Sequence, residues 1–362
     1  MTRADLDPIA GLHHVTVMSG DPDGNVRFFR NVLGLRLLKR TVNFDDVTTY
    51  HLYYGDETGT PGTVYTVFPF GDGRRGRNGT GEVSATAFAV PEGSLDYWRE
   101  RLESRGVAVR EPEERFGARV LPFTDPDGQE LELIERGAQS APDGRGRSPR
   151  EPFDDVEPWA DSPVPADHQI RGFHGVTLRL SEVNATADLL TFVGYEEGAA
   201  AGDRTRFRAA GDRGAVVDLV ERPGMAPAGG GIGSVHHVAF RVPDDDAQAA
   251  WQETLRDRGQ QVTPVKDRQY FRSIYFREPG GVLFEFATEG PGFAVDEPVG
   301  ALGEELKLPE WLETHRERIE SALPALSAAD EPATGGDAGH DTDGGTEHEA
   351  DADPTEEVAT HE

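Results

Sequence analysis

GLHHVTV, at residues 11–17, and SVHHVAF, at residues 234–240, each place a doubled histidine at the start of an apolar segment with the residue preferences of a β-strand. The pairs are His13-His14 and His236-His237. A later segment, PGGVLFEF at residues 279–286, carries Glu285 in an otherwise apolar strand. Two imidazoles and one carboxylate from separate strands form the ligand set of an open, three-ligand site for a divalent metal. The three strands are therefore predicted to meet.

An internal repeat extends from these segments over most of the chain. Each copy begins with an apolar strand, continues with a helical stretch and ends in strands that follow a glycine turn. The four copies span Gly11–Phe70, Val83–Glu135, Gly172–Val220 and Ser234–Thr288. The pattern predicts an α+β fold of four βαβββ repeats. Because His14 lies in the first copy and His237 and Glu285 in the fourth, those two copies are expected to close on each other.

The copies divide the chain into two halves. An N-terminal domain is expected over residues 1–136 and a C-terminal domain over residues 171–325, each with two repeats, and the second also with a terminal helix at Leu308–Leu323. Residues 137–170 are rich in Pro, Gly, Ser, Asp and Arg and are interpreted as a linker. Residues 326–362 are interpreted as a disordered acidic tail, because they have too little apolar surface to offset the entropy of ordering.

The composition excludes several classes of protein. A formal net charge of −30 argues against nucleic acid and against anionic membranes as partners. Acidic residues this numerous, with lysine only at Lys39, Lys266 and Lys307, suggest a halophilic protein in a salt-rich cytoplasm, where ions screen the self-repulsion. The absence of cysteine excludes disulfides, thiolate metal sites and cysteine nucleophiles. No apolar stretch reaches membrane length, so a cytoplasmic protein is expected.

The repeated unit resembles the vicinal oxygen chelate superfamily, which includes glyoxalases, bleomycin-resistance proteins and extradiol dioxygenases. Within it, several strings resemble the ring-cleaving dioxygenases that open hydroquinones: KRTVNFD at 39–45, YHLYY at 50–54, GTPGT at 59–63 and RGFH at 171–174. The resemblance implies that paired repeats curl into two half-open, barrel-like cups. It also implies a small aromatic substrate and dioxygen as co-substrate. A homo-oligomer is compatible with the sequence, which does not determine the oligomeric state.

The resemblance also assigns residues one at a time. The metal ligands match His14, His237 and Glu285, and the polar residues that meet substrate and oxygen match His13, Thr16, His236, Arg268 and Tyr275. It implies iron(II) as the cofactor, although imidazole and carboxylate ligands also accept manganese(II). The expected reaction inserts oxygen into the ring beside a hydroxyl group. His13, His236 and Tyr275 would move protons or donate hydrogen bonds, and Arg268 would stabilise negative charge.

Read without the resemblance, these residues have very different support. One strand histidine is usually structural, but two matched pairs and a carboxylate in an apolar strand favour a metal site, because a buried carboxylate requires a cation. His13 and His236 would be structural, since neighbouring residues on a strand point to opposite faces. Arg268 and Tyr275 have no sequence signal of their own. His51 and His174 are interpreted as packed histidines and not as ligands.

The other repeats lack the complete ligand set. Ala85 and Gly175 stand where the ligand histidines would be, so Glu132 and Asp218 have no imidazole partners and one metal per chain is expected. Two alternatives remain. A glyoxalase-like isomerase needs a fourth ligand, and Val67 stands where that carboxylate would end the first repeat. A non-catalytic small-molecule binding protein of this superfamily would be half this length and would need no triad.

Overall fold

Each of the four repeats folds as a strand, a helix and three further strands in the computed structural model, which describes residues 6–136 and 156–333. The first repeat contains β1 (Leu12–Ser19), α1 (Pro22–Val26), which continues into the π-helical segment η2 (Arg27–Val32), β2 (Arg36–Asn43), β3 (Asp46–Gly55) and β4 (Val64–Pro69). The second contains β5 (Glu82–Pro91), α2 (Leu95–Ser104), β6 (Glu113–Arg115), β7 (Ala118–Thr124) and β8 (Glu130–Arg136). The third contains β9 (Phe173–Leu180), α3 (Asn184–Val193), β10 (Glu196–Ala201), β11 (Arg204–Arg208) and β12 (Val216–Glu221). The fourth contains β13 (Ser234–Val242), α4 (Asp245–Asp257), β14 (Lys266–Asp267), β15 (Phe271–Arg277) and β16 (Leu283–Pro291).

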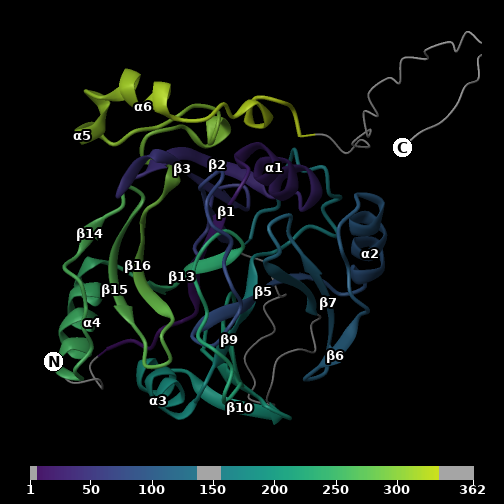
Figure 1. Ribbon diagram of the computed structural model, residues 1–362, viewed down its shortest axis with the longest axis vertical. Helices are drawn as coiled ribbons and strands as arrows, with labels where there is room; N and C mark the ends of the chain where they lie inside the picture. Colours follow the sequence, from purple (N-terminus) through teal and green to yellow (C-terminus); the bar gives the residue numbers. More distant parts are fainter. Residues whose placement is uncertain (1–5, 137–155, 334–362) are drawn as a thin grey trace, which may run out of the picture.

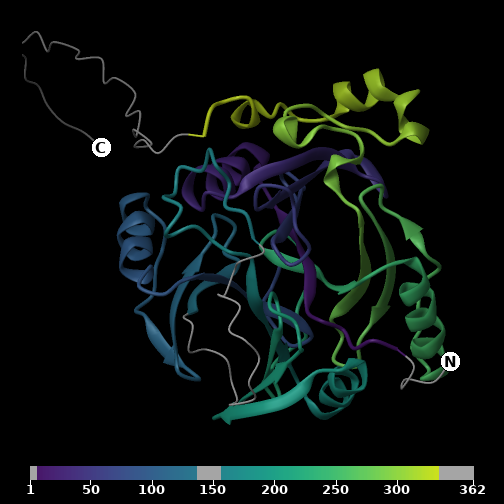
Figure 2. The same cartoon turned by 180° about the vertical axis from the view of Figure 1, so that it is seen from behind.

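The sixteen strands form two curled, eight-stranded sheets (Figures 1 and 2). The first sheet has the order β14-β15-β16-β13-β1-β4-β3-β2 and unites the fourth repeat with the first. The second has the order β10-β11-β12-β9-β5-β8-β7-β6 and unites the third repeat with the second. The predicted α+β fold with two cups is confirmed, as is the closure of the first repeat on the fourth. Both halves of the chain contribute strands to each sheet. The division into an N-terminal domain at residues 1–136 and a C-terminal domain at residues 171–325 stays a prediction.

The main hydrophobic core joins the two sheets. Successive ring contacts run from Phe29 to Tyr65, Phe88 and Phe173, with centroids 4.7, 5.8 and 5.3 Å apart. Buried aromatic side chains of this size contribute strongly to core stability. The helices lie on the outer faces of the sheets, with α4 against β15 and β16 and α2 against β7 and β8 (Figure 1).

The C-terminal region differs from the single helix expected at Leu308–Leu323. It forms two short helices, α5 (Glu310–Glu313) and α6 (Arg316–Ala322), because the backbone leaves the helical conformation at His315, where φ is −112°. The break allows Leu308 and Ile319 to pack on Val42 of β2. The 3₁₀ helices η3 (Phe293–Val295) and η4 (Val299–Ala301) precede this region, and η5 (Ser327–Ala329) follows it.

Two predicted irregular segments are described only in part. Residues 156–170 of the expected linker pack on the body, with Val164 and Ile170 buried, and Leu326 and Ala328 at the start of the expected tail are buried as well. Residues 137–155 and 334–362 lie outside the described part of the chain. Among the helices of residues 6–136 and 156–333, none is both long and apolar enough to cross a membrane.

Candidate metal centre

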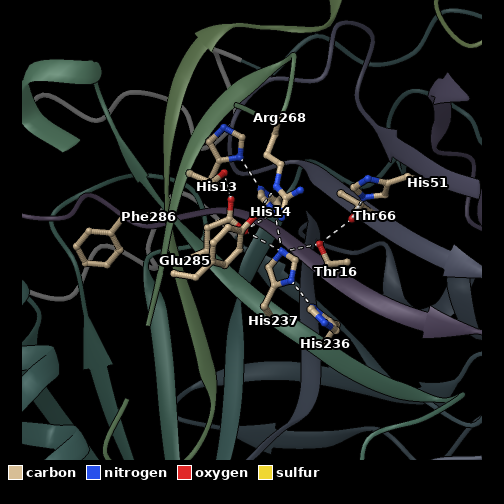
Figure 3. A network of polar contacts seen from close by, with 12 residues as sticks. His13, His14, Thr16, His51, Thr66, His236, His237, Arg268, Glu285 and Phe286 are labelled. Atoms are coloured by element: carbon tan, nitrogen blue, oxygen red, sulfur yellow. Dashed lines mark hydrogen bonds and ion pairs between the residues drawn. The ribbon is translucent and has the colours of Figure 1, made fainter. Parts of the chain in front are cut away.

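Three neighbouring strands of the first sheet bring His14, His237 and Glu285 together (Figure 3). The Nε2 atoms of the two histidines are 3.1 Å apart. Glu285 Oε2 lies 3.3 Å from Nε2 of His14 and 2.8 Å from Nε2 of His237. All three side chains are buried, with exposed fractions of 4% or less. The predicted ligands therefore converge from two ends of the chain.

The donor atoms fit a divalent cation. Oε2 of Glu285 is buried without a hydrogen-bond partner, and it faces two nitrogens that also carry lone pairs. Burial would raise the pKa of Glu285, but His14 and His237, where they carry protons, hold that pKa well below its usual range. A divalent cation in the place of those protons would stabilise the carboxylate in the same way. Ligands at right angles on an octahedron are separated by √2 times the bond length. Separations of 2.8–3.3 Å thus correspond to bonds of about 2.0–2.3 Å, as for three ligands on one face of an octahedral metal.

Each ligand histidine is held through its second ring nitrogen by the histidine before it. The Nδ1 atoms of His13 and His14 are 2.9 Å apart, and those of His236 and His237 are 2.7 Å apart. Burial, with His14 nearby, lowers the pKa of His13 to about 3, and burial, with His237 nearby, lowers the pKa of His236 to about 4. The rings of His13 and His236 are therefore neutral, and the Nδ1 atom of each can accept a hydrogen bond. The Nδ1–H groups of His14 and His237 then donate these hydrogen bonds, which leaves on each Nε2 a lone pair of the kind that binds a metal.

The β1–β13 pairing explains how two consecutive histidines can serve one site. Its register shifts between Leu12 and His14, and again opposite the step from Thr16 to Val17. The residues left out of register are His13 on β1 and His236 on β13. A β-bulge re-aims the extra residue, so the alternation of a regular strand does not apply there. This is the physical reason why an argument from alternation would have made both residues structural.

A hydrogen-bond chain leads away from the triad across the cup. Thr16 Oγ1 lies 2.9 Å from His237 Nε2 and 2.7 Å from Thr66 Oγ1. Thr66 contacts His51 Nε2 at 2.9 Å, and Tyr53 contacts His51 Nδ1 at 2.8 Å. Burial lowers the pKa of His51 well below its usual value, so this ring is neutral. His51 lies outside the triad and belongs to the polar network of the site (Figure 3).

Arg268 and Tyr275 complete the set of predicted residues around the triad. Tyr275 pairs with Glu285 across β15 and β16, and its ring centroid lies 5.7 Å from that of His237. Arg268 Nε donates to the Tyr275 hydroxyl at 3.1 Å. Burial raises the pKa of Tyr275 far above its usual value, so the phenol keeps its proton. The fold thus gathers all eight residues named from the sequence in one cup.

Sequence reasoning missed one residue that holds the triad. Ser273 donates a short hydrogen bond to Glu285 Oε1, the oxygen that does not face the histidines. Ser273 lies two residues before Tyr275 on β15, so strand alternation could have placed it on the same face. Phe271, two residues earlier again, packs its ring 5.0 Å from His13 and 4.9 Å from His14.

The position of the missing fourth ligand needs correction. In the fourth repeat Glu285 pairs with Ala239, two residues after His237, and in the first repeat Thr66 pairs with Thr16, two residues after His14. Thr66 is therefore the counterpart of Glu285, and Val67 belongs to the hydrophobic core. The position expected at Val67 is one residue out of register, and a shift of one residue moves a side chain to the other face of a strand. The position still carries no carboxylate.

In the second cup, arginines pair with the carboxylates that correspond to Glu285. Arg115 contacts both oxygens of Glu132 at 2.8 and 2.9 Å, and Arg206 contacts both oxygens of Asp218 at the same distances. Within residues 6–136 and 156–333, the first-cup triad is the one group of three or more ligand side chains close enough to hold a metal. This arrangement supports the expectation of one metal per chain.

A comparison of the sequence with protein families matches residues 11–133 and 175–286 to the Glyoxalase/Bleomycin resistance protein/Dioxygenase superfamily. MhqO of Bacillus subtilis (strain 168), provisionally named a ring-cleaving dioxygenase, is 44% identical over 86% of this chain and 95% of its own. A chlorohydroquinone/hydroquinone 1,2-dioxygenase of Sphingobium indicum is 38% identical over 86% of this chain and 95% of its own.

Solved structures agree with the sequence relatives. The crystal structure of a Bacillus subtilis protein provisionally described as a dioxygenase superposes with a TM-score of 0.78, at 43% identity over 89% of this chain and 98% of its own. Glyoxalase I from Zea mays has a TM-score of 0.54 at 18% identity, over 77% of this chain and 92% of its own, and shows a similar fold.

Proposed function

Because this chain belongs to the Glyoxalase/Bleomycin resistance protein/Dioxygenase superfamily and, within it, to the ring-cleaving dioxygenases, we propose that it is an iron(II)-dependent dioxygenase that opens hydroquinone-type aromatic rings. The observation that carries this proposal is the buried triad of His14, His237 and Glu285, whose three donor atoms lie 2.8–3.3 Å from one another. Two imidazoles and one carboxylate with open positions are typical of non-haem iron(II) oxygenases.

The triad residues would hold the metal through Nε2 of His14, Nε2 of His237 and Oε2 of Glu285. When bound, iron(II) supplies the redox chemistry that allows triplet dioxygen to react with a closed-shell aromatic ring. Ser273 fixes the orientation of the Glu285 carboxylate. Support of this kind from outside the ligand set typically changes metal affinity by about 10- to 100-fold.

The surrounding residues would bind and orient the substrate. A para-diphenol that binds through one hydroxyl directs its second hydroxyl away from the triad, toward a separate partner. Arg268, Tyr275 and His236 are the candidates for that partner, and Arg268 would stabilise negative charge on it. Thr16 would donate to an oxygen atom near His237, and His13 would keep His14 in its ligand tautomer. Phe271 closes one side of the site against water.

The alternatives are disfavoured by specific features. A glyoxalase-like isomerase would need a fourth protein ligand, and Thr66 occupies that position. A binding protein without catalysis would not need Glu285 buried and ionised beside two imidazoles. Manganese(II) remains a second candidate metal, because the same ligand set accepts it.

The salt-rich cytoplasm inferred from the composition belongs to this proposal as well. The net charge of −30 and the presence of only three lysines support it, because ions at high concentration screen repulsion between surface carboxylates. A small aromatic compound and dioxygen are the proposed partners of the site. A homo-oligomer is compatible with this chemistry, since the triad is complete within one chain.

Oxygen uptake by anaerobically metal-loaded protein tests the function. Samples loaded with iron(II), manganese(II) or zinc(II) receive hydroquinone, chlorohydroquinone or catechol. We expect one metal per chain, and one dioxygen consumed per hydroquinone with iron(II). Glu285→Gln should lose both metal and uptake, while Glu132→Gln, at the matching position of the second cup, should keep both. Absence of uptake with both redox-active metals, in protein that binds one metal through the triad, would refute the proposal.

A further inference from the structure

An ion pair joins the two open edges of the first sheet. β14 and β2 are the edge strands of this sheet, at opposite ends of its order. Asp45, in the turn between β2 and β3, lies 3.0 Å from Arg268 Nη2 and 3.6 Å from Lys266 Nζ, both at the other edge. The first repeat thus contacts the fourth at the sheet edges as well as through the β1–β13 pairing that builds the triad.

This ion pair fixes one end of the Arg268 side chain, and Tyr275 fixes another point. Nε donates to the Tyr275 hydroxyl at 3.1 Å, and the guanidinium carbon lies 5.4 Å from the centre of the Tyr275 ring. Nη2 donates to Asp45 Oδ2. Among the described residues, Nη1 of Arg268 forms no hydrogen bond or ion pair. A guanidinium held in this way keeps one NH₂ group available in a fixed direction.

The backbone next to Arg268 is also constrained. Gln269 has a φ of +70°, a left-handed conformation that few residues other than glycine adopt. Its N–H donates to Asp267 Oδ1 at 2.8 Å, and the N–H of Tyr270 donates to the carbonyl of Arg268 at 2.8 Å. The tight turn determines where the Arg268 side chain begins, and Asp45 determines where it ends.

We propose that Asp45 is a positioning residue for the reaction, which orients the Arg268 guanidinium from the opposite edge of the sheet so that Nη1 can bind the distal hydroxyl of a para-diphenol. The inference rests on the proposed function. Asp45 is 61% exposed and the Arg268 side chain 19% exposed. An ion pair with so exposed a partner contributes little to folding stability, so its removal should change orientation and leave the fold intact.

The chain offers a matched control for Asp45. Asp46 is the next residue in the same turn, and its carboxylate accepts only local hydrogen bonds, from the backbone N–H of Thr48 at 3.2 Å, the Thr48 hydroxyl at 2.7 Å and the Thr49 hydroxyl at 3.1 Å. Asp46→Asn removes the same charge at nearly the same place without touching Arg268. Asp45→Glu keeps the charge on a longer side chain and serves as the conservative variant.

The first measurement needs neither metal nor turnover. In ¹⁵N-labelled, metal-free protein, the Arg268 Nε–H signal is assigned by its loss in Arg268→Lys. We expect slow exchange with water in the wild type and in Asp46→Asn, exchange about tenfold faster or more in Asp45→Asn, and partial recovery in Asp45→Glu. An unchanged Arg268 signal in Asp45→Asn overturns the proposal.

The second measurement is steady-state turnover of hydroquinone by the iron-loaded enzyme. Asp45→Asn should lower kcat/KM about tenfold, with metal content unchanged and the thermal midpoint within about 2 °C of the wild type. In an Arg268→Gln background the same substitution should change kcat/KM less than about twofold, because the pair acts as one unit. A full tenfold loss in that background, or no loss in the wild-type background, overturns the positioning role. If the wild type turns over no hydroquinone, the proposed function fails and the role in substrate binding falls with it. The exchange data would still show whether Asp45 orients Arg268.

Discussion

In the second cup, Asp218→Asn removes a charge that two arginines share. Asp218 is 2% exposed and Arg206 7% exposed, and Arg204 also contacts the carboxylate at 3.0 Å. Breaking a buried ion pair by removing one partner costs about 3–5 kcal/mol. The lower end applies here, because the Asn oxygen can still accept one hydrogen bond from Arg206.

The expected shift in melting temperature follows from the size of the folded body. About 310 residues are described, and at about 2.1 cal/mol/K per residue their unfolding entropy is about 650 cal/mol/K. A loss of about 3 kcal/mol then lowers the thermal midpoint by about 4–5 °C. Metal content should stay at one equivalent, because Asp218 neutralises arginines and holds no metal.

Calorimetry and elemental analysis of the same samples check both parts of this prediction. Glu285→Gln is the matched control at the equivalent position of the first cup, and it should lose the metal. A midpoint within 1 °C of the wild type would show that Asp218 does not neutralise the arginines. Loss of one metal equivalent in Asp218→Asn would show that the second cup holds an ion.

Three further predictions concern the first cup and the C-terminus. Ser273→Ala should weaken metal binding about 10- to 100-fold, as measured by competition with a chelator, and unchanged affinity would remove Ser273 from the support of Glu285. Hydroquinones should be opened faster than catechol, which binds through two oxygens and should act mainly as an inhibitor; faster oxygen uptake with catechol than with every hydroquinone tested would place the enzyme in the catechol-cleaving branch. Truncation after Ala333 should leave metal content and the thermal midpoint unchanged at high salt, and a clear fall in either would show that residues 334–362 contribute to the body.

The repeat pattern was sufficient to predict the four βαβββ units and the meeting of the first with the fourth. Periodicity and glycine turns mark the start and end of each unit, and the distribution of ligands between His14 and Glu285 required those two units to pair. The break at His315 was not predictable, because it depends on how the last residues follow the edge of the sheet. Propensity alone favoured one continuous helix there.

The triad was predictable because ligand chemistry and repetition coincide at the same strand positions. The surrounding residues were less accessible to sequence reasoning. His13 and His236 reach the site only through β-bulges, which hydrophobic alternation does not reveal. Arg268 depends on an ion pair across 223 positions of sequence, with Asp45, and no local pattern contains it. The resemblance to a family supplied these residues, and the fold supplies their physical reason.

In the sequence, all strands of the second sheet lie between the two groups of strands that form the first sheet, and this order has a consequence for biosynthesis. The strands of the second sheet, β5 to β12, have all left the ribosome when Glu221 has emerged, but β1 must wait for β13 and β16. His14 and Glu285 are 271 positions apart. At about 5–20 residues per second, translation separates them by roughly 14–54 s. The nascent chain therefore cannot assemble the triad until nearly all of the body has been made, and capture of the metal is expected to be among the last events of maturation. A circular permutant that begins at the fourth repeat should acquire its metal earlier during synthesis, and stalled ribosome complexes of the two forms would show whether it does.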